Sequence, residues 1–405
     1  MTHQTLLVTL SGADRPGVTS ALFTELSAFD VRVDDIEQLV VRGRLVLSVL
    51  LGLNDDASTT SGIEAALLKV AEHLGMELDT RIGPDEDRAR RHGEVTVTVL
   101  GRPLRPAAIA RVADEIRAKG GNIDRIHRIA KYPVTAVVLE VSAAEVGDLR
   151  RVLTVAGRES GVDIAVQTDG LDRRGQHLVV LDVDSTVIQE EVIDLLAAEA
   201  GVEPEVSAIT ERAMRGEIDF TQSLRERAAL LAGLDANALS RIRERITLTP
   251  GARTLCRTLK TLGYRICLVS GGFIDVVQPL ADELGVDAVR ANRLEIVDGR
   301  LTGRIDGPVI DREGKRSALE QFATEFDIPM RRTIAIGDGA NDIDMLQAAG
   351  LGVAFNAKSA ARAAADAALN VPYLDTVLYL LGITREQVEA ADSAAGVESR
   401  APVID

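Results

Sequence analysis

The second half of the sequence contains a series of apolar runs of strand length, separated by stretches with helical spacing. These runs occupy residues 177–183, 265–269 and 333–336, with weaker ones at 352–355 and 368–371. Strands that are apolar on both faces are typical of a parallel sheet covered by helices. The pattern predicts a Rossmann-like, doubly wound α/β domain over residues 176–390, in which ligands bind beyond the carboxyl ends of the strands.

Polar motifs follow three of these runs, at the point where each predicted strand ends. They are Asp182-Val183-Asp184-Ser185-Thr186, Ser270-Gly271-Gly272 and Gly337-Asp338-Gly339-Ala340-Asn341-Asp342. Residues two apart in a strand face the same side, so Asp182 and Asp184 converge if the extended backbone continues. Two carboxylates that close are unfavourable without a cation or proton between them, which favours Mg²⁺. Asp338 would complete the metal's ligands, and Asp342 would orient it from slightly farther out.

Each motif also has a plainer interpretation. The first could be an acidic turn, the second a tight glycine turn and the third a helix cap. Lys315, which opens a predicted helix, could be an ordinary solvated lysine. A hydroxyl beside backbone N–H groups at a helix start can instead bind an anion, as Ser270 would. Because all three motifs follow strands of one parallel sheet, their coincidence at one edge favours a functional site.

Histidine and overall charge exclude several classes of function. No histidine follows His177, so the C-terminal half alone cannot form a Ser-His-Asp triad or a histidine-ligated zinc site. A net charge of −16 disfavours nucleic-acid binding. No apolar run reaches the ~18 residues that span a bilayer. The N-terminus lacks a basic segment followed by an apolar one, so we expect a cytoplasmic protein that does not bind membranes.

The first part of the chain reads as an internal repeat. Residues 1–84 and 93–168 each show the order β-α-β-β-α-β, which predicts two ferredoxin-like modules. A helical insert at about 188–248 interrupts the later sheet after its first strand. A hairpin over 293–304, with a turn at Asp298-Gly299, forms a second insert. Residues 391–405 are small and polar, and we expect a flexible tail.

The ordered set DxDST, SGG, lysine and GDGANDxxML resembles the haloacid dehalogenase superfamily. Within it, residues 178–385 are similar to the phosphoserine phosphatase family throughout. The matching pieces of the inserts are residues 190–194, 215–220, 223–227 and 291–294. The N-terminal repeats resemble ACT domains, with the turn Asp14-Arg15-Pro16-Gly17 after the first strand. The second copy departs at that turn, where it has Gly101-Arg102-Pro103-Leu104.

The resemblance implies Mg²⁺-dependent hydrolysis of O-phospho-L-serine to L-serine and phosphate, the last step of L-serine biosynthesis. Asp182 would be the nucleophile that forms an aspartyl-phosphate. Asp184 would act as general acid and then general base, and its backbone carbonyl would bind the metal beside Asp182 and Asp338. The groups that would bind the transferring phosphoryl oxygens are Ser270, Gly271, Gly272 and Lys315.

The resemblance also assigns the recognition of the rest of the substrate. Glu191 would pair with the substrate's ammonium, and Arg227 would hold its carboxylate. Met214 and Phe220 would close the site against water, and Asn341 would hydrogen-bond near the phosphate or the attacking water. Taken alone, the two charges could be ordinary surface charges, and the two apolar residues could be core of the inserted helices.

Two partners follow from the ACT-like repeats: an amino-acid effector such as L-serine, and a second copy of the chain in a homodimer. The repeats could instead be scaffolds for dimerisation without an effector. Other functions also remain open. The enzyme could act on another small phosphate monoester or on a phosphoprotein, or the chain could be an amino-acid-sensing regulator with an inactive phosphatase-like half.

Overall fold

The computed structural model describes residues 4–53, 57–84, 95–170, 175 and 177–397. The chain divides into two compact units, Met1–Arg90 and Arg91–Asp405, and each is described by itself. The second unit therefore contains both the second ferredoxin-like module and the α/β domain.

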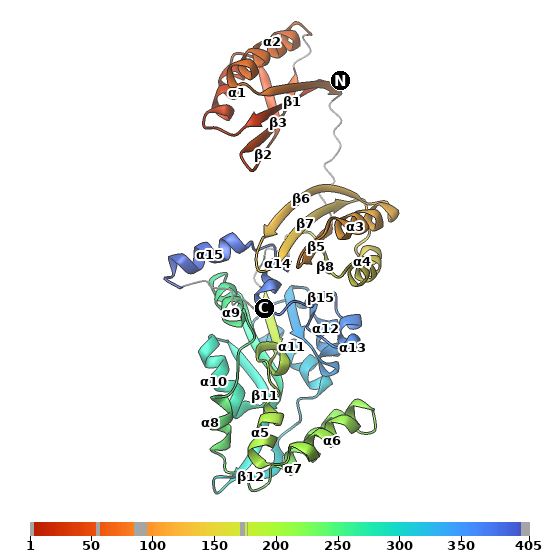
Figure 1. Ribbon diagram of the computed structural model, residues 1–405, viewed down its shortest axis with the longest axis vertical. Helices are drawn as coiled ribbons and strands as arrows, with labels where there is room; N and C mark the ends of the chain where they lie inside the picture. Colours follow the sequence, from red (N-terminus) through yellow and green to blue (C-terminus); the bar gives the residue numbers. More distant parts are fainter. Residues whose placement is uncertain (1–3, 54–56, 85–94, 171–174, 176, 398–405) are drawn as a thin grey trace. The chain divides into compact units, whose positions relative to one another are not determined.

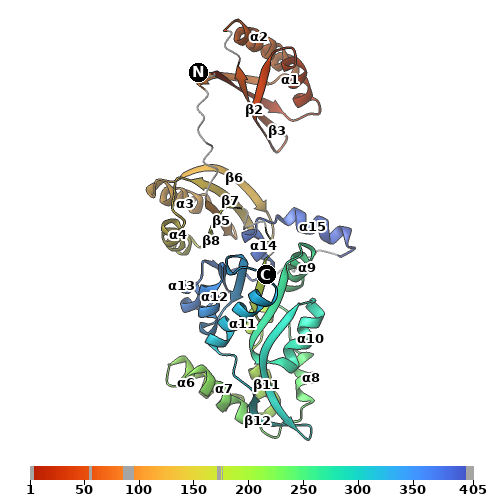
Figure 2. The ribbon, with the colours of Figure 1, turned by 180° about the vertical axis from the view of Figure 1, so that it is seen from behind.

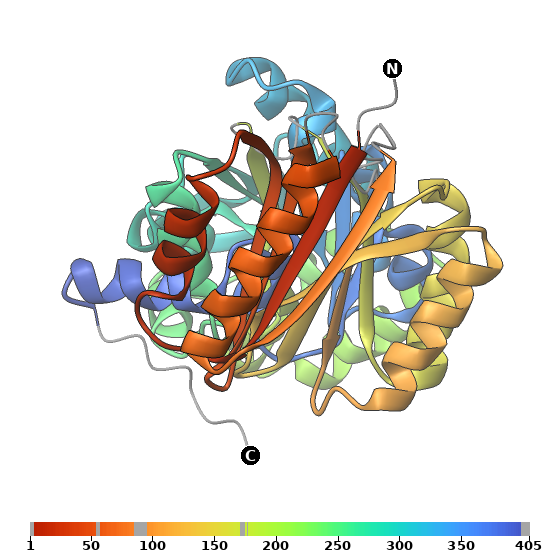
Figure 3. The ribbon, with the colours of Figure 1, turned by 90° about the horizontal axis from the view of Figure 1, so that it is seen from above.

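The first unit is a four-stranded antiparallel sheet in the order β2-β3-β1-β4. Its elements are β1 (Gln4–Ala13), α1 (Val18–Leu26), β2 (Val31–Val41), β3 (Arg44–Leu53), α2 (Ala57–Leu74) and β4 (Glu77–Pro84). Alternating leucine and valine side chains of β1 and β3 point to one face and form the core. Helices α1 and α2 lie side by side over that face (Figures 1 and 3). The observed βαββαβ order is the predicted one.

The second ferredoxin-like module repeats this arrangement, with strands in the order β6-β7-β5-β8. Its elements are β5 (Val95–Gly101), α3 (Pro106–Ala118), β6 (Asn122–Ala130), β7 (Thr135–Ser142), α4 (Val146–Ser160) and β8 (Asp163–Thr168). Val95, Val97 and Val99 of β5 pack under both helices, and Leu100 joins the core of the α/β domain, so the strand is buried along its whole length.

The α/β domain is built on parallel strands in the order β11-β10-β9-β13-β14-β15. These are β9 (Leu178–Asp182), β10 (Arg265–Phe273), β11 (Ala288–Val297), β13 (Thr333–Gly337), β14 (Leu351–Phe355) and β15 (Ala367–Leu369). In β9, Val179 and Leu181 enter one core while Leu178 and Val180 enter the other. A strand with two buried faces thus explains the unbroken apolar run that the sequence shows.

Helices cover both faces of this sheet (Figures 1 and 2). Helices α9 (Ala252–Thr261) and α10 (Ile274–Leu284) contribute to one core. Helices α11 (Arg312–Glu325), α12 (Ile343–Ala348) and α13 (Ser359–Ala364) contribute to the other. The sheet is therefore doubly wound, as predicted.

The two predicted inserts are both present. The first contains helices α5 (Val192–Ala200), α6 (Glu203–Met214), α7 (Phe220–Ala229) and α8 (Ala238–Arg243). The second pairs the end of β11 with the antiparallel strand β12 (Arg300–Asp306). Their turn, Asp298-Gly299, has φ values of 50° and 74°. Positive φ at both positions is the conformation that Asp-Gly hairpin turns favour.

The second ferredoxin-like module and the parallel sheet form one 11-stranded sheet, because β8 pairs with β15 through Ala165 and Ala367. Polar contacts reinforce this seam. The Asp163 carboxylate accepts hydrogen bonds from the backbone and side-chain nitrogens of Asn370, each at 2.7 Å. Gln167 donates to the Leu380 carbonyl at 2.8 Å. The sequence analysis placed the second ferredoxin-like module and the α/β domain in separate ranges, 93–168 and 176–390, and it gave no sign of this shared sheet.

The end of the chain differs from the prediction. Helix α15 (Arg385–Ala394) extends into the stretch predicted as a flexible tail at 391–405. Its residue Asp392 is buried and bound by Arg257 of α9 at 2.7 Å. This ion pair holds the last helical turn, so residues 391–394 belong to the folded unit, whereas 398–405 lie outside the described residues. The described helices include none that is long and apolar enough to cross a membrane.

Candidate active site

A cavity of about 700 Å³ lies at the carboxyl ends of β9, β10 and β13, under the inserted helices. Predicted site residues that line it are Asp182, Asp184, Glu191, Met214, Phe220, Arg227, Gly271, Gly272, Asp338 and Asn341. Ser270, Lys315 and Asp342 are fully buried behind this lining and bind residues that form it. The three strand-end motifs therefore do meet at one edge of the sheet.

A buried ammonium group lies at the centre of the acidic cluster. Lys315 Nζ donates to Asp182 Oδ1 at 2.6 Å and to Asp342 Oδ1 at 2.7 Å, and its side chain has no exposed surface. Burial alone would lower the pKa of Lys315, but the two carboxylates raise it above its usual range, so the ammonium stays charged. The Asp311 cap, which accepts from Gly314 N at 2.9 Å, starts α11 and places Lys315 in its first turn.

Negative charge exceeds positive charge in this cluster. Asp182, Asp338 and Asp342 each offer an oxygen within 4.8 Å of the others. Burial, reinforced by Asp342, raises the pKa of Asp338 to about 6 and that of Asp182 well above its ordinary value. Additional positive charge would be needed to keep these carboxylates ionised. Carboxylate oxygens are the ligands that Mg²⁺ prefers, so the donor set fits a hard divalent cation.

Asp342 is the carboxylate least available to bind a metal ion, because protein donors bind both of its oxygens. Its Oδ1 accepts from Lys315, and its Oδ2 accepts from Gly339 N at 2.9 Å. A Cβ at Gly337 would lie 2.4 Å from the Asp342 carboxyl carbon, so only glycine lets Asp342 approach the strand end. Asp342 thus holds the lysine and the loop.

Asp184 is fixed by a separate set of hydrogen bonds. Its Oδ1 accepts from Val192 N at 2.8 Å, and its Oδ2 accepts from Ser270 Oγ at 2.9 Å. Gly272 N donates to that same hydroxyl at 2.7 Å, which leaves the Ser270 proton directed at Asp184. Burial raises the pKa of Asp184. The carboxyl group is therefore positioned, and it favours protonation more than an exposed aspartate does.

The path by which Asp184 reaches the cavity differs from the predicted one. Strand β9 ends at Asp182, and Val183–Val187 form a turn in which Ser185 has a φ of 57°. Side-chain alternation along an extended strand therefore does not bring Asp182 and Asp184 together. The turn that follows Asp182 nevertheless keeps Asp184 at the strand end, where both carboxyl groups line the same cavity.

The inserted helices contribute one acid and one base to the far side of the cavity. Glu191, at the N-cap of α5, accepts from Ser185 Oγ at 2.9 Å. Burial, with a contribution from the Asp184 charge, raises the pKa of Glu191 to about 7. Arg227 lies in the last turn of α7 and lines the same cavity. Both side chains therefore line the cavity, and Glu191 is also exposed to solvent.

Phe220 and Met214 differ in their environments. A Cβ at Gly271 would lie 2.9 Å from the Phe220 ring, so the ring packs directly on the strand-end loop. The Met214 side chain lines the cavity but is 68% exposed, which excludes the interpretation that it is core of the inserted helices. An exposed methionine at a cavity rim is free to change conformation over a bound ligand.

The sequence analysis missed several residues that line this cavity. They include Asp194, Ser223, Arg312 and Lys358. Ser223 lies one helical turn before Arg227, so helical spacing could have placed it on the same face. The Ser223 hydroxyl is buried and has no hydrogen-bond partner among the described residues. Nothing in the local sequence pointed to Lys358, which enters from the loop after β14.

Comparisons with known proteins identify the family of the chain. It is 55% identical over 396 residues to a phosphoserine phosphatase of Streptomyces coelicolor, covering 96% of this chain and 95% of that protein. It is 50% identical over 390 residues to a phosphoserine phosphatase of Mycobacterium tuberculosis, covering 96% and 95%. The chain belongs to the phosphoserine phosphatase family. The predicted family resemblance is thus confirmed.

Family models and a solved structure agree with this assignment. The model for haloacid dehalogenase-like hydrolases matches residues 179–347, and models for the ACT domain match 4–81 and 94–167. A probable phosphoserine phosphatase from Vibrio cholerae is similar in structure, with a TM-score of 0.57 and 33% identity, covering 75% of this chain and 89% of that one. The predicted fold class, two ACT domains before a haloacid dehalogenase-like domain, is confirmed.

The buried ammonium group gives a first prediction. Replacing Lys315 with methionine leaves Asp182 and Asp342 buried without their partner, so Lys315→Met should lower the free energy of unfolding by roughly 3–5 kcal/mol. Urea unfolding of chelator-treated protein, followed by circular dichroism, measures the loss. Lys260→Met is the matched control: its ion pair with Asp287 is partly exposed, and its removal should change stability by less than about 1 kcal/mol. Equal stability of the two variants would contradict the prediction.

Proposed function

We propose that the chain is a phosphoserine phosphatase that hydrolyses O-phospho-L-serine to L-serine and phosphate. The observation that carries the proposal is the single cavity that brings Asp182, Asp184 and Asp338 opposite Glu191 and Arg227. Phosphoryl chemistry needs a nucleophile and positive charge at one end of the site. At the other end of the site, recognition of an amino acid needs a carboxylate to bind its ammonium and a guanidinium to bind its carboxylate.

The first step forms a bond between an Asp182 carboxylate oxygen and the substrate's phosphorus. The bond from phosphorus to the serine oxygen breaks, and that oxygen takes the proton of the Asp184 carboxyl group as it leaves. The Ser270 hydroxyl and the backbone N–H of Val192 hold Asp184 in place for this transfer. Asp184 is then a carboxylate, and it removes a proton from the water that attacks the aspartyl-phosphate. Phosphate leaves, and Asp182 is regenerated.

Charge around the phosphoryl group is shared between Lys315 and a divalent cation. We propose that the side chains of Asp182 and Asp338, with the Asp184 carbonyl, hold Mg²⁺, while Asp342 supports Lys315 and the loop. When bound, Mg²⁺ neutralises the repulsion between the Asp182 carboxylate and the phosphate dianion. Gly271 and Gly272, which lie on the cavity wall, and Asn341 would position the phosphate or the attacking water.

Replacing the nucleophile tests the chemistry. Asp182→Asn removes a carboxylate but keeps the shape, so phosphate release from phosphoserine should fall at least about a thousandfold with Mg²⁺ present. Phosphate release is measured beside wild type, with and without chelator, and with a generic aryl phosphate as second substrate. Wild-type release from the aryl phosphate alone would keep the chemistry but exclude the proposed roles of Glu191 and Arg227. No release from either would support an amino-acid-sensing regulator with an inactive phosphatase-like half.

The pKa of Glu191, about 7, gives a prediction for pH dependence. A carboxyl group with a raised pKa is neutral below that value and cannot pair with the substrate's ammonium. The KM for phosphoserine should therefore rise as the pH falls from about 8 to about 6. An aryl phosphate, which titrates at its phosphate but has no ammonium, supplies the control. In Glu191→Gln the difference between the two substrates should disappear. The same pH profile of KM for both substrates in wild type would refute this role.

We also propose that the chain forms a homodimer through its first ACT domain. Strand β2 is an edge strand, and its apolar side chains Ile36, Leu39 and Val41 are 47%, 62% and 59% exposed. An exposed apolar edge favours pairing with another strand, and a second copy supplies a matching one. Light scattering should give twice the mass of one chain for wild type. Leu39→Asp should shift it toward monomer, whereas Leu262→Asp, a 49% exposed site elsewhere, should not. A wild-type monomer would exclude the dimer.

An amino-acid effector is the second proposed role of the ACT domains. The turn Asp14-Arg15-Pro16-Gly17 leads into α1, with Gly17 at a φ of 98° and Asp14 N bonded to the Gly43 carbonyl at 2.7 Å. This turn leaves the Asp14 side chain exposed. Calorimetric titration of the full chain with L-serine should show one site in the catalytic cavity and another that Asp14→Ala removes. Identical titrations of wild type and variant would leave the ACT domains as scaffolds.

A further inference from the structure

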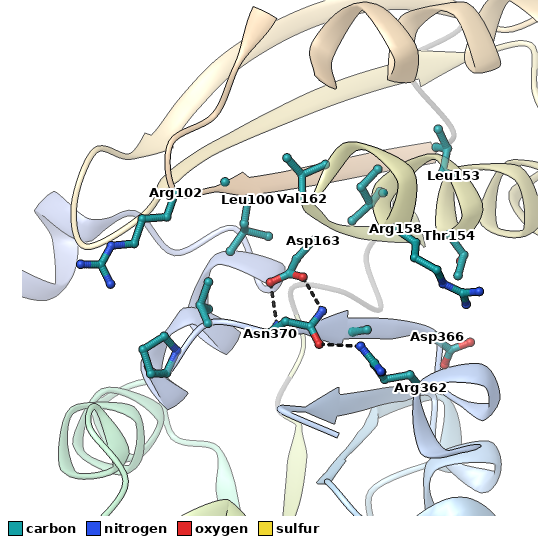
Figure 4. Close-up of a pocket in the computed structure, with 17 residues that line it drawn as sticks. Leu100, Arg102, Leu153, Thr154, Arg158, Val162, Asp163, Arg362, Asp366 and Asn370 are labelled. Atoms are coloured by element: carbon teal, nitrogen blue, oxygen red, sulfur yellow. Dashed lines mark hydrogen bonds between the residues drawn. The ribbon is translucent and has the colours of Figure 1, made fainter. Parts of the chain in front are cut away.

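A second cavity, of about 480 Å³, lies along the seam between the second ACT domain and the parallel sheet (Figure 4). One side is formed by the end of β5, by α4 and by the start of β8. The other side is formed by α13, β15 and the segment after it. Both sides belong to the same compact unit. This groove is separate from the catalytic cavity, and the proposed reaction makes no use of it.

The carboxylates of this groove already have partners. Asp163 accepts both bonds from Asn370, which the dashed lines of Figure 4 mark. Asp366 pairs with Arg150 at 2.6 Å and accepts from Gly352 N at 2.9 Å. The charge of Asp366 is therefore balanced by Arg150, whereas Asp163 is held by neutral donors and its charge is attracted to the nearby Arg362.

Two of the arginines that line the groove, Arg158 and Arg362, are exposed and have few protein partners. Arg158, in the last turn of α4, forms no ion pair or hydrogen bond with any residue in the described part of the chain. Arg362 of α13 donates to Asn370 Oδ1 at 3.3 Å, a long bond to a neutral acceptor. A charged oxygen acceptor forms shorter and stronger bonds with guanidinium groups, so an oxyanion would compete well for Arg362. Although the chain has a net charge of −16, these two arginines provide local positive charge beside the cavity, which would attract an anion.

The floor of the groove is apolar. Its apolar lining residues are Leu100, Val162 and Ile164 of the ACT domain and Val371 and Pro372 of the catalytic domain. A cavity with an apolar floor and a few charged groups at its sides is typical of sites for small organic molecules. A carbon skeleton could rest on this floor while its charged group reaches the arginines.

Helix α13 connects the groove to the catalytic cavity. Arg362 lines the groove, while Lys358, Ser359 and Ala360, at the start of the same short helix, line the catalytic cavity. Lys358 N also donates to the Asp338 carbonyl at 3.1 Å. A ligand that draws Arg362 away from Asn370 would therefore act on a helix whose other end touches the catalytic aspartate loop.

We propose that this groove is a regulatory site for a small metabolite with a phosphate or carboxylate group, bound by Arg158 and Arg362. Its occupancy reaches the catalytic cavity through α13. The site differs from the ACT turn at Asp14–Gly17, since it is formed jointly by the second ACT domain and the catalytic domain.

Binding of two named probes tests the site. Inorganic phosphate and L-malate are titrated separately into the full chain without added metal, followed by calorimetry. The double variant Arg158→Gln/Arg362→Gln should bind at least one probe at least roughly tenfold more weakly, because it loses charge-assisted hydrogen bonds. Arg151→Gln is the matched control: it lies on α4, is exposed and does not line the groove. Since phosphate can also enter the catalytic cavity, the difference between the two variants reports the groove.

The two probes distinguish a phosphate-bearing ligand from a carboxylate ligand. A loss with phosphate alone assigns the site to phosphate-bearing metabolites, and a loss with malate alone assigns it to carboxylates. If the double variant and Arg151→Gln bind both probes equally, the proposal is wrong. Circular dichroism and the thermal midpoint show whether the double variant is folded. If it is not, Arg158→Gln is compared instead, because Arg158 has no partner among the described residues to lose.

Amide hydrogen exchange tests the coupling through α13 and does not depend on the proposed reaction. The bound probe should slow amide hydrogen exchange in residues 361–364, which do not line the catalytic cavity, more in wild type and Arg151→Gln than in the double variant. The kcat or KM for phosphoserine should shift with the same concentration dependence. A probe that binds without changing exchange in α13 or either kinetic constant would overturn the coupling.

Discussion

The catalytic half of this protein depends on one buried cation held between carboxylates. Lys315 has no exposed surface, and its ammonium lies 2.6 Å from Asp182 and 2.7 Å from Asp342. Burying a charge in a protein interior is unfavourable unless partners surround it, so the positions of these three side chains determine one another. Two local features help to place these side chains. Gly337 leaves room for Asp342, and the Asp311 cap starts α11 so that Lys315 lies in its first turn. The fold tolerates the cluster because three strand ends and one helix start meet there.

The same electrostatic arrangement separates the roles of the carboxylates. Asp342 has both oxygens occupied by donors from the protein. Asp182 and Asp338 line the cavity, and each has one oxygen bound, by Lys315 and by Thr186 respectively. Asp184 stands apart, tied to Ser270 and to the start of α5. These aspartates thus differ in chemical role because their hydrogen-bond partners differ. The inserted helices add Glu191 and Arg227, which would give such chemistry its selectivity.

The second unit joins an ACT domain to the catalytic domain by backbone pairing. Because β8 and β15 belong to the same 11-stranded sheet, the second ACT domain is a structural extension of the catalytic domain. The proposed regulatory groove lies along this seam, and residues at the start and in the middle of α13 line the catalytic cavity and the groove respectively. The first ACT domain forms a compact unit of its own with an exposed apolar edge, which suits assembly between chains.

The sequence by itself determined the fold class and most of the catalytic end of the site. Unbroken apolar runs required strands buried on both faces, and parallel strands bring their carboxyl ends to one edge, so Asp182, Ser270 and Asp338 could be placed together without coordinates. Only the tertiary structure decided the rest. The turn at 183–187, the burial of Lys315, the exposure of Met214 and the lining position of Lys358 depend on contacts between segments far apart in sequence. The seam between β8 and β15 likewise rests on one short strand pairing and a few polar contacts, which leave no periodic pattern in either segment.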